Sequence, residues 1–441
     1  MGTLTDLLGG MLYLTLSVGS FDHSPALEQP IRASAPAPSL EIVDDRGRAI
    51  TQEGLVLVDW EGYIANPAVK FYLVPPPDTA FPARAVLSAS ESRLHFDLPS
   101  EVGRDGPRKE VIWQKCEKQP VSFAIFPDRD GQDERHRLRI AFSDARGRRE
   151  SLSVPVRVID QDRTRANAFS ITVDFSQDRT GFFQDERKRA TVIQAADDWA
   201  YFLAGMNLEP IAKGTEQTLI WGSNGFKTST RVNNAQKYSG FLLYAYGIRN
   251  ELPRSDAAVP QARRLLTRDP AARLIRSGGE PSPYGEFQVA GGNKKPIRRS
   301  GGLEIEVQGN YNTLGWLVTV SDGEWWKAAN LGDAAADLYS IAHHEIGHAL
   351  IFNPNNSLVR RGETLKDDRV RAYLGSFPAL NQSDHFEGVI DPASLHGAFG
   401  NEYHGRMPRG RWLITKLDLL CARSIGYELR ETSAFKVDPH P

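Results

Sequence analysis

The chain has 441 residues, of which 40% are hydrophobic and 24% are charged, and its formal net charge is −2. These values are ordinary for a globular protein and predict two or three domains of roughly 100 to 200 residues each. The nearly balanced charge gives no reason to expect a nucleic-acid partner, and no apolar run approaches the roughly 18 residues of a transmembrane helix.

Residues 1–38 are predicted to be an N-terminal segment and linker that precedes the folded domains. The stretch "MGTLTDLLGGMLYLTLSVGS" has a short apolar core but lacks the positive start of a signal peptide. It is compatible with a degraded signal, a first strand or a disordered start. Residues 20–38 are rich in Pro, Ala and Ser, which is typical of a linker.

Residues 39–160 are predicted to form an all-β domain. Short apolar or alternating runs indicate strands; they are "LEIVDD", "GLVLVDW", "AVKFYLVPP", "VSFAIFP", "HRLRIAFSD" and "LSVPVRVID". Their spacing predicts a small antiparallel sandwich of the immunoglobulin-like class. The acidic loop 128–133 only partly matches a calcium-binding loop, so we interpret it as a hairpin turn.

Residues 166–441 are predicted to form a second, α+β domain. "FSITVDF" (169–175) alternates like a strand with one buried face, and a helix is predicted in the following "DERKRATVIQAADDWAYFLAGMN". Its apolar stripe comprises Val192, Ala196, Trp199 and Leu203. More strands are expected at 240–248, 303–309 and 315–321, and the Arg-, Gly- and Pro-rich stretch 250–300 is interpreted as a surface excursion with a short helix.

The sequence His344-Glu345-Ile346-Gly347-His348 is an H-E-x-x-H motif, which is typical of zinc hydrolases. It lies in a predicted helix that begins at the Ala334–Ala336 run, with Asp333 as N-cap. Residues four apart share one helix face, about 5–6 Å apart. His344 and His348 can therefore bind one Zn²⁺ at about 2.0–2.1 Å. Glu345 stands beside that face, where it can take a proton from zinc-bound water.

A catalytic zinc usually has three protein ligands and one water, so a third ligand must come from elsewhere. One candidate is Glu363 in "GETLKDD", which also supplies Asp367, as in a thermolysin-type site. The other is a third histidine. The short metzincin spacing fails, because Ile351 and Pro354 occupy its positions, and the next histidine is His385.

The segments "NQSDHFEG" and "NEYHGRMPRGRWLITKLDLLCARSIGY" resemble the leishmanolysin-type metzincins, in which an insertion separates the motif from the third histidine. The resemblance spans roughly residues 169–427 and is specific over 339–427. It implies that His385 is the third ligand and is followed by the aromatic Phe386, and that Met407 forms the methionine turn. The sequence departs from that family in two respects. Ile351 stands where the family has glycine, and the cysteine-rich pattern is absent.

The last helix of such a domain corresponds to "ITKLDLLCARSIGY". Thr415 with Asp418 makes a capping-box-like start, and Gly426 is a natural helix stop. The buried stripe is expected to comprise Leu417, Leu420, Cys421 and Ile425.

The resemblance implies a metzincin-like catalytic domain with a mixed twisted sheet, an active-site helix and a C-terminal helix. It implies a secreted or extracytoplasmic zinc endopeptidase whose peptide substrate pairs with the strand near 315–321. Asp384 is a candidate for orienting a ligand imidazole, or is a solvated loop carboxylate. Tyr403 is a weaker candidate for stabilising the oxyanion, because it precedes Met407 whereas the tyrosine of such metzincins follows the methionine. His343 points off the metal face and is expected to pack or to support a ligand. The preceding sandwich is a candidate for binding a partner or the substrate.

Two alternatives stay open at this point. The chain could be a non-catalytic binding protein with a structural zinc site, although an intact Glu345 argues against this. It could also be a zinc hydrolase of a non-peptide amide. The two cysteines, Cys116 and Cys421, are interpreted as buried free thiols rather than a disulfide.

Overall fold

The computed structural model describes two long stretches of the chain and a series of shorter segments after them, within one compact unit, Ser39–Pro441. The described residues are 39–50, 54–91, 93–96, 107–178, 181–204, 212–214, 216–221, 228–233, 235, 237, 241–248, 272–274, 286–288, 294–296, 301–308, 315–317, 335–351, 366–379, 386, 413–424 and 427–436.

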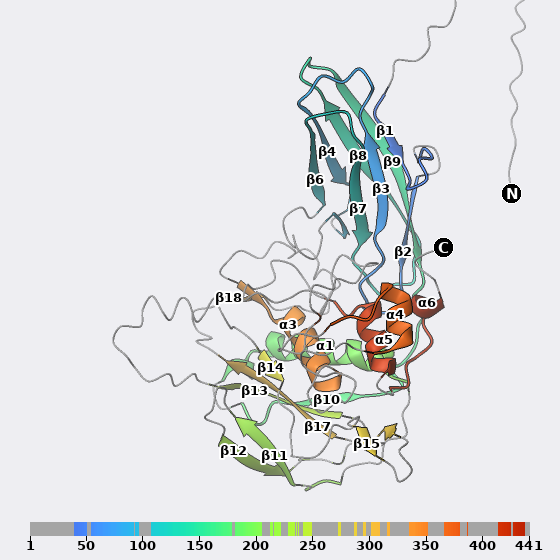
Figure 1. Ribbon diagram of the computed structural model, residues 1–441. Helices are drawn as coiled ribbons and strands as arrows, with labels where there is room; N and C mark the ends of the chain where they lie inside the picture. The colour runs from blue at the N-terminus through green and yellow to red at the C-terminus, as the bar shows by residue number, and fades with distance from the viewer. Residues whose placement is uncertain are drawn as a thin grey trace, which may run out of the picture. The chain divides into compact units, whose positions relative to one another are not determined.

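Residues 41–160 form a β-sandwich of two sheets, with strand orders β1-β3-β7-β5 and β2-β9-β8-β4-β6 (Figure 1). The strands are β1 Glu41–Val43, β2 Leu55–Asp59, β3 Val69–Val74, β4 Ala83–Ala89, β5 Leu94–His95, β6 Arg108–Trp113, β7 Gln119–Ile125, β8 Glu134–Ser143 and β9 Arg149–Asp160. The predicted immunoglobulin-like sandwich is confirmed. It is not antiparallel throughout, because β2 pairs with β9 in parallel.

Both sheets contribute to one apolar core. Leu138, Ile140 and Phe142 alternate with exposed residues along β8, so every second side chain points inward. They share a cluster with Phe71 of β3 and Phe123 of β7 in the other sheet. Full burial of such a side chain contributes roughly 1.5–3 kcal/mol, which explains why alternation alone predicts these strands.

The loop 126–133 is not the predicted hairpin turn. It leads from β7, which pairs with β3 and β5, to β8, which pairs with β4 and β9 in the other sheet. The turn residues Asp130-Gly131 indicated a reversal of the chain, and Gly131 does adopt a positive φ of 73°. Turn residues report local backbone shape but do not select the sheet that the next strand joins.

A further four-stranded sheet, outside the sandwich, has the strand order β10-β13-β17-β14. The pairs β10–β13 and β13–β17 are parallel, and β14 is antiparallel to β17. The predicted strands at 169–175, 240–248 and 303–309 all contribute to it. Its strands are β10 Ile171–Asp174, β13 Phe241–Ile248, β14 Ala272–Leu274 and β17 Gly301–Gln308.

Helix α1, Glu186–Phe202, follows β10 and a 3-10 turn, η2 Phe182–Gln184. Asp185 caps it by accepting a hydrogen bond from the Arg187 backbone N–H. The predicted stripe is confirmed by the burial of all its members, Val192, Ala196, Trp199 and Leu203. Apolar residues at this spacing turn one side of the helix into the core.

Helix α3, Leu338–Leu350, begins four residues later than predicted. The preceding Ala335–Asp337 forms β19, which pairs in parallel with β18, Gly315–Leu317. Strand pairing therefore overrides the helix propensity of the alanines, as tertiary context often does. The expectation that Asp333 caps this helix is wrong for the same reason.

The remaining helices are α4 Asp368–Leu374, α5 Lys416–Ser424 and α6 Ser433–Lys436. The capping box of α5 is confirmed. The Thr415 backbone N–H donates to Asp418 Oδ2 at 2.9 Å, and the Asp418 N–H donates to Thr415 Oγ1 at 3.2 Å. Leu417, Leu420 and Cys421 are buried as predicted, whereas Ile425 and Gly426 lie outside the described residues.

Short strand pairs complete the described part of the fold: β11 Glu216–Trp221 with β12 Thr228–Asn233, and β15 Glu286–Gln288 with β16 Lys294–Pro296. Within 250–300 the described residues are strands, and the short helix expected there lies outside them. None of the helices in the described segments is long and apolar enough to cross a membrane.

Neither of the two cysteines forms a disulfide, and only one of them is buried. Cys421 lies in the core, but Cys116 is exposed, so the prediction of two buried thiols is wrong for Cys116. Its segment "WQKCEKQP" connects β6 to β7 at the surface, where charged neighbours give no apolar cover.

Gly62 lies where its backbone meets two aromatic rings of α1. Its φ is +84°, and an added Cβ would lie 2.9 Å from the ring atoms Cδ1 and Cε1 of Tyr201, which is buried. We expect Gly62→Ala to lower the unfolding free energy by roughly 2–5 kcal/mol, from backbone strain plus overpacking. Denaturant titration measures this loss.

Gly47→Ala is the matched control, since Gly47 has a φ of +78° and nothing within 4 Å of an added Cβ. It should lose only the strain component, roughly 1–2 kcal/mol. Equal losses in the two variants would show that the contact of Gly62 with α1 contributes nothing.

Candidate metal centre

Helix α3 carries the H-E-x-x-H motif. Because the helix runs without a break from Leu338 to Leu350, the backbone positions of His344 and His348 are one turn apart on one face. The His344 side chain is 7% exposed, while the side chains of Glu345 and His348 lie outside the described part. Two imidazoles at this spacing are a donor set that suits Zn²⁺. The sequence-predicted residues of this helix therefore fit the predicted ion.

A buried carboxylate on α1 binds the side of α3 next to the motif. Asp198 Oδ2 lies 2.8 Å from His343 Nε2 and also accepts a hydrogen bond from the Tyr339 hydroxyl. Its other oxygen, Oδ1, accepts from Gln194 Nε2 at 2.7 Å. Neither Asp198 nor His343 is exposed. Buried polar groups of this kind are stable only when their hydrogen bonds are made.

A second contact joins the same two helices. The Trp199 indole Nε1–H donates to the backbone carbonyl of His343 at 2.9 Å. At the far end of α3, the Tyr427 hydroxyl donates to the Leu350 carbonyl, also at 2.9 Å. These bonds satisfy polar groups inside the core and fix α3 at both ends of the motif.

Sequence reasoning missed Asp198 and Tyr339. A signal was present, because Asp198 stands three residues after Ala195 and four before Phe202, both of which are buried. A charged residue on the apolar face of a helix requires a partner in the core. Tyr339 and His343 are four residues apart, so they face the same neighbour.

Several predicted site residues lie outside the described residues, and their predicted roles stay predictions: Glu363, Asp384, His385, Tyr403 and Met407. Phe386, next to His385, is described and belongs to the same apolar cluster as Ile346 of α3. Asp367 caps α4, where its Oδ1 accepts from the backbone N–H groups of Arg369 and Val370.

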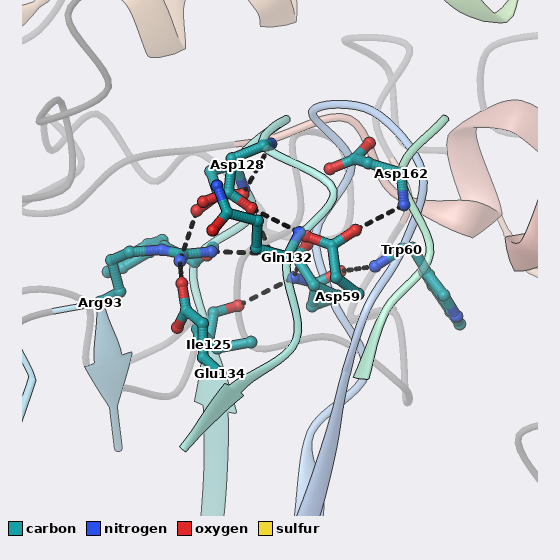
Figure 2. A network of polar contacts seen from close by, with 12 residues as sticks. Asp59, Trp60, Arg93, Ile125, Asp128, Gln132, Glu134 and Asp162 are labelled. Atoms are coloured by element: carbon teal, nitrogen blue, oxygen red, sulfur yellow. Dashed lines mark hydrogen bonds and ion pairs between the residues drawn. The ribbon is translucent and has the colours of Figure 1, made fainter. Parts of the chain in front are cut away.

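Carboxylates also converge at one end of the sandwich, around Arg93 (Figure 2). Arg93 is 5% exposed and binds Asp59 at 2.7 Å, Glu134 at 2.5 Å and also Asp128. Burial raises the pKa of Asp59 well above its ordinary value, against the lowering effect of Arg93. This network holds loop 126–133 in place, which accounts for its path between the sheets.

Two overlapping groups of acidic residues in this network have oxygens within 4.8 Å of one another, close enough to hold a metal ion. They are Asp59, Asp128 and Asp160, and Asp128, Asp130 and Glu134. The guanidinium of Arg93 already supplies positive charge to Asp59, Asp128 and Glu134. We therefore interpret the cluster as a structural ion-pair network.

Asp162 gives this region a pH dependence. Burial, with Asp160 and Asp128 nearby, raises its pKa to about 7, although the Gly62 N–H donates to its Oδ1 at 2.7 Å. The unfolded pKa is about 3.9, so the folded state binds the extra proton. The associated stability is present at low pH and is lost as the pH rises from about 4 to 7.

Asp162→Asn keeps an oxygen for Gly62 and removes the ionisation. We expect its stability relative to wild type to be higher at pH 8 than at pH 5, as measured by urea unfolding at both values. If the difference between the two proteins were the same at both pH values, Asp162 would not titrate in this range.

Comparison with known proteins gives no family. No model of a known protein family matches the chain, and no curated protein matches it. One similar solved structure is PapD-like domain 7 of human CEP192, with 12% identity over 33% of this chain and 99% of that one and a TM-score of 0.22. Another is the E. coli chaperone DraB, with 9% identity over 29% of this chain and 57% of that one and a TM-score of 0.19. A third is the fimbrial subunit MyfA of Yersinia enterocolitica, with 12% identity over 27% of this chain and 95% of that one and a TM-score of 0.17. The chain thus spans just over half of the chaperone. These likenesses say nothing about what this chain binds.

The predicted membership of the leishmanolysin-type metzincins is wrong. The similar structures are PapD-like, chaperone and fimbrial folds rather than metzincin proteases, and neither a family model nor a curated protein supports a protease. The α+β region is therefore not identified as a metzincin catalytic domain. The physical reason is that H-E-x-x-H requires only one helical turn, which many folds supply.

Proposed function

We propose that this chain is a zinc-dependent hydrolase of amide bonds, with peptides as its substrates. The observation that carries the proposal is the position of His344, Glu345 and His348 on one continuous helix, α3. The proposal requires no family membership, because it rests on the spacing of the donors and of the base. Zinc, when bound, would polarise the scissile carbonyl and acidify a water molecule.

The chain's own residues supply the rest of the chemistry. Neutral imidazoles at 344 and 348 would hold the ion. Glu345 lies about 100° further round the helix than His344, so it is beside the metal face and not on it. In this position its carboxylate takes a proton from the attacking water and returns it to the leaving amine.

We propose His385 as the third ligand, with Glu363 as the alternative. Phe386 supports His385, because it is fully buried in the apolar cluster that also contains Ile346 and Ala342 of α3. The carboxylate of Asp367 is engaged in capping α4, which makes it a poor candidate. Asp384 and Tyr403 keep their proposed roles in orienting an imidazole and in stabilising the oxyanion.

An extended peptide would be held by β-augmentation at a sheet edge near α3. Strand β14 ends the four-stranded sheet on the side away from β10, and it contacts α3. The strand at 315–321, which the sequence favoured, is paired with β19 through Gly315–Leu317. Among the described strands, β18 and β14 each have one partner, and we propose β14 as the edge that pairs with the substrate because it extends the larger sheet.

The alternatives remain a non-catalytic binding protein with structural zinc and a hydrolase of a non-peptide amide. In either case the sandwich could bind a protein partner. Secretion also stays a prediction, and after the loss of the family resemblance it rests on the apolar stretch within residues 1–38, which lie outside the described residues.

Casein cleavage by the purified chain, before and after removal of metal with 1,10-phenanthroline, tests the proposal. We expect cleavage that is lost on chelation, restored by zinc and absent in His348→Ala. Zinc binding without cleavage of casein or of small amides would support the structural site. Cleavage of small amides alone would support the non-peptide hydrolase.

A further inference from the structure

The side of α3 next to its motif is fixed by a buried polar contact that a packed helix pair does not need. Asp198 of α1 accepts hydrogen bonds from Tyr339 and His343, which are one turn apart on α3. All three side chains are 1% exposed or less. An apolar pair would fill the same space without burying a charge, and such replacements are often neutral or stabilising. The contact therefore calls for a role other than packing.

The geometry points to a role in orientation. Apolar contacts allow a helix to rotate or slide a little, whereas hydrogen bonds are directional and weaken steeply when bent. Two donors on successive turns of α3 converge on one carboxylate oxygen, which fixes the rotation of the helix. The Trp199 indole N–H donates to the His343 carbonyl at 2.9 Å, and this bond fixes the position of α3 along the axis of α1.

The adjacent residue makes this orientation important. His344 follows His343 directly, so any rotation of α3 about its axis moves the 344 and 348 positions together by the same angle. Zinc sites tolerate little error, since Zn–N distances are confined to about 2.0–2.1 Å. Holding the helix in one rotation therefore fixes the backbone positions of both histidines before the ion binds.

We propose that Asp198, with Tyr339 and His343, is a positioning clamp for the metal-binding face of α3. This inference rests on the proposed zinc site and deepens it. Both carboxylate oxygens of Asp198 are engaged by Tyr339, His343 and Gln194, so its proposed effect is on how the ligands are presented. Loss of the clamp should weaken zinc binding and change the geometry of the bound ion, while the fold remains.

The test compares wild type with Asp198→Asn, Tyr339→Phe and Val192→Ala. Zinc affinity is measured by competition with a chromophoric chelator, and geometry by the visible absorption bands of the Co²⁺-substituted proteins. Val192 is fully buried on α1 but has no part in the clamp, so its variant controls for lost stability. Circular dichroism establishes that each variant is folded.

We expect Asp198→Asn to weaken zinc binding by about 10- to 100-fold, the range typical of residues that support metal ligands, and to shift the Co²⁺ bands. Tyr339→Phe, which loses one donor and keeps its ring, should show a smaller effect in the same direction. Val192→Ala should match wild type in both measurements.

Wild-type affinity and Co²⁺ bands in Asp198→Asn, or in Tyr339→Phe if Asp198→Asn does not fold, would overturn the clamp and leave the proposed function intact. If Val192→Ala weakened zinc binding as much as Asp198→Asn, the effect of Asp198 would be one of general packing, and the clamp would be overturned. A wild-type chain that binds neither Zn²⁺ nor Co²⁺ would instead overturn the proposed function, and the clamp with it.

Discussion

Replacement of Glu345 by glutamine is expected to lower kcat/KM by roughly 10²- to 10⁴-fold, the usual contribution of a general acid–base residue. Glutamine has nearly the same size and helix propensity as glutamate, so α3 should keep its structure. The two imidazoles are unchanged, and zinc content should therefore match wild type. The distinguishing result is a protein that keeps its metal and loses its activity.

Steady-state kinetics on a peptide substrate, with zinc content measured on the same preparations, give this result directly. Glu186→Gln is the matched control, because Glu186 is exposed in the first turn of α1 and has no part in the proposed site. Full activity in Glu345→Gln would remove Glu345 as the base. Another group would then have to take the proton from the attacking water.

Replacement of Arg93 by methionine is expected to give the largest loss of stability in the sandwich, about 3–5 kcal/mol near neutral pH. Methionine fills the space of the side-chain stem but removes the charge that Asp59, Asp128 and Glu134 share. Asp59 is 1% exposed, so its carboxylate would be left buried and poorly paired. The loss should shrink at lower pH, since protonation removes the repulsion among the carboxylates.

Arg84→Met is the matched control for this variant. Arg84 is exposed and stands 3.8 Å from Glu110, a pair that is expected to contribute at most about 1 kcal/mol. Urea unfolding at pH 5 and pH 7 separates the two. An Arg93→Met loss no larger than that of Arg84→Met would mean that the network shown in Figure 2 does not stabilise the sandwich.

Local patterns predicted the elements whose stability is local. The buried stripe of α1 and the capping box of α5 follow from residue spacing within a single turn or two, and both are present. The alternating strands of the sandwich were found for the same reason, since burial of every second residue is visible in the sequence.

The misses came from contacts between distant segments. Ala335–Asp337 has the composition of a helix start but pairs with Gly315–Leu317 instead. The loop 126–133 resembles a hairpin, yet Asp128 within it forms an ion pair with Arg93 and donates its backbone N–H to Asp59, and these contacts accompany its path between the sheets. The sequence predicts that Asp198 needs a partner in the core, but it does not identify Tyr339 and His343 as the partners.

The family assignment failed for a related reason. The H-E-x-x-H motif encodes the spacing of two ligands and one base on a helix, and that information is independent of the surrounding fold. The residues that carried the finer resemblance, His385 and Met407, lie outside the described residues. The chemistry of α3 can therefore be proposed from its own geometry, whereas the family could not be.

Elemental analysis of the purified wild-type chain, alongside His385→Ala and Glu363→Ala, is the most direct test of the central claim that α3 belongs to a zinc site. The account predicts one zinc ion per wild-type chain, loss of that zinc in His385→Ala, and its retention in Glu363→Ala. Loss of zinc in Glu363→Ala alone would show that Glu363, and not His385, is the third ligand. A wild-type chain without zinc, even after incubation with the ion, would contradict the account.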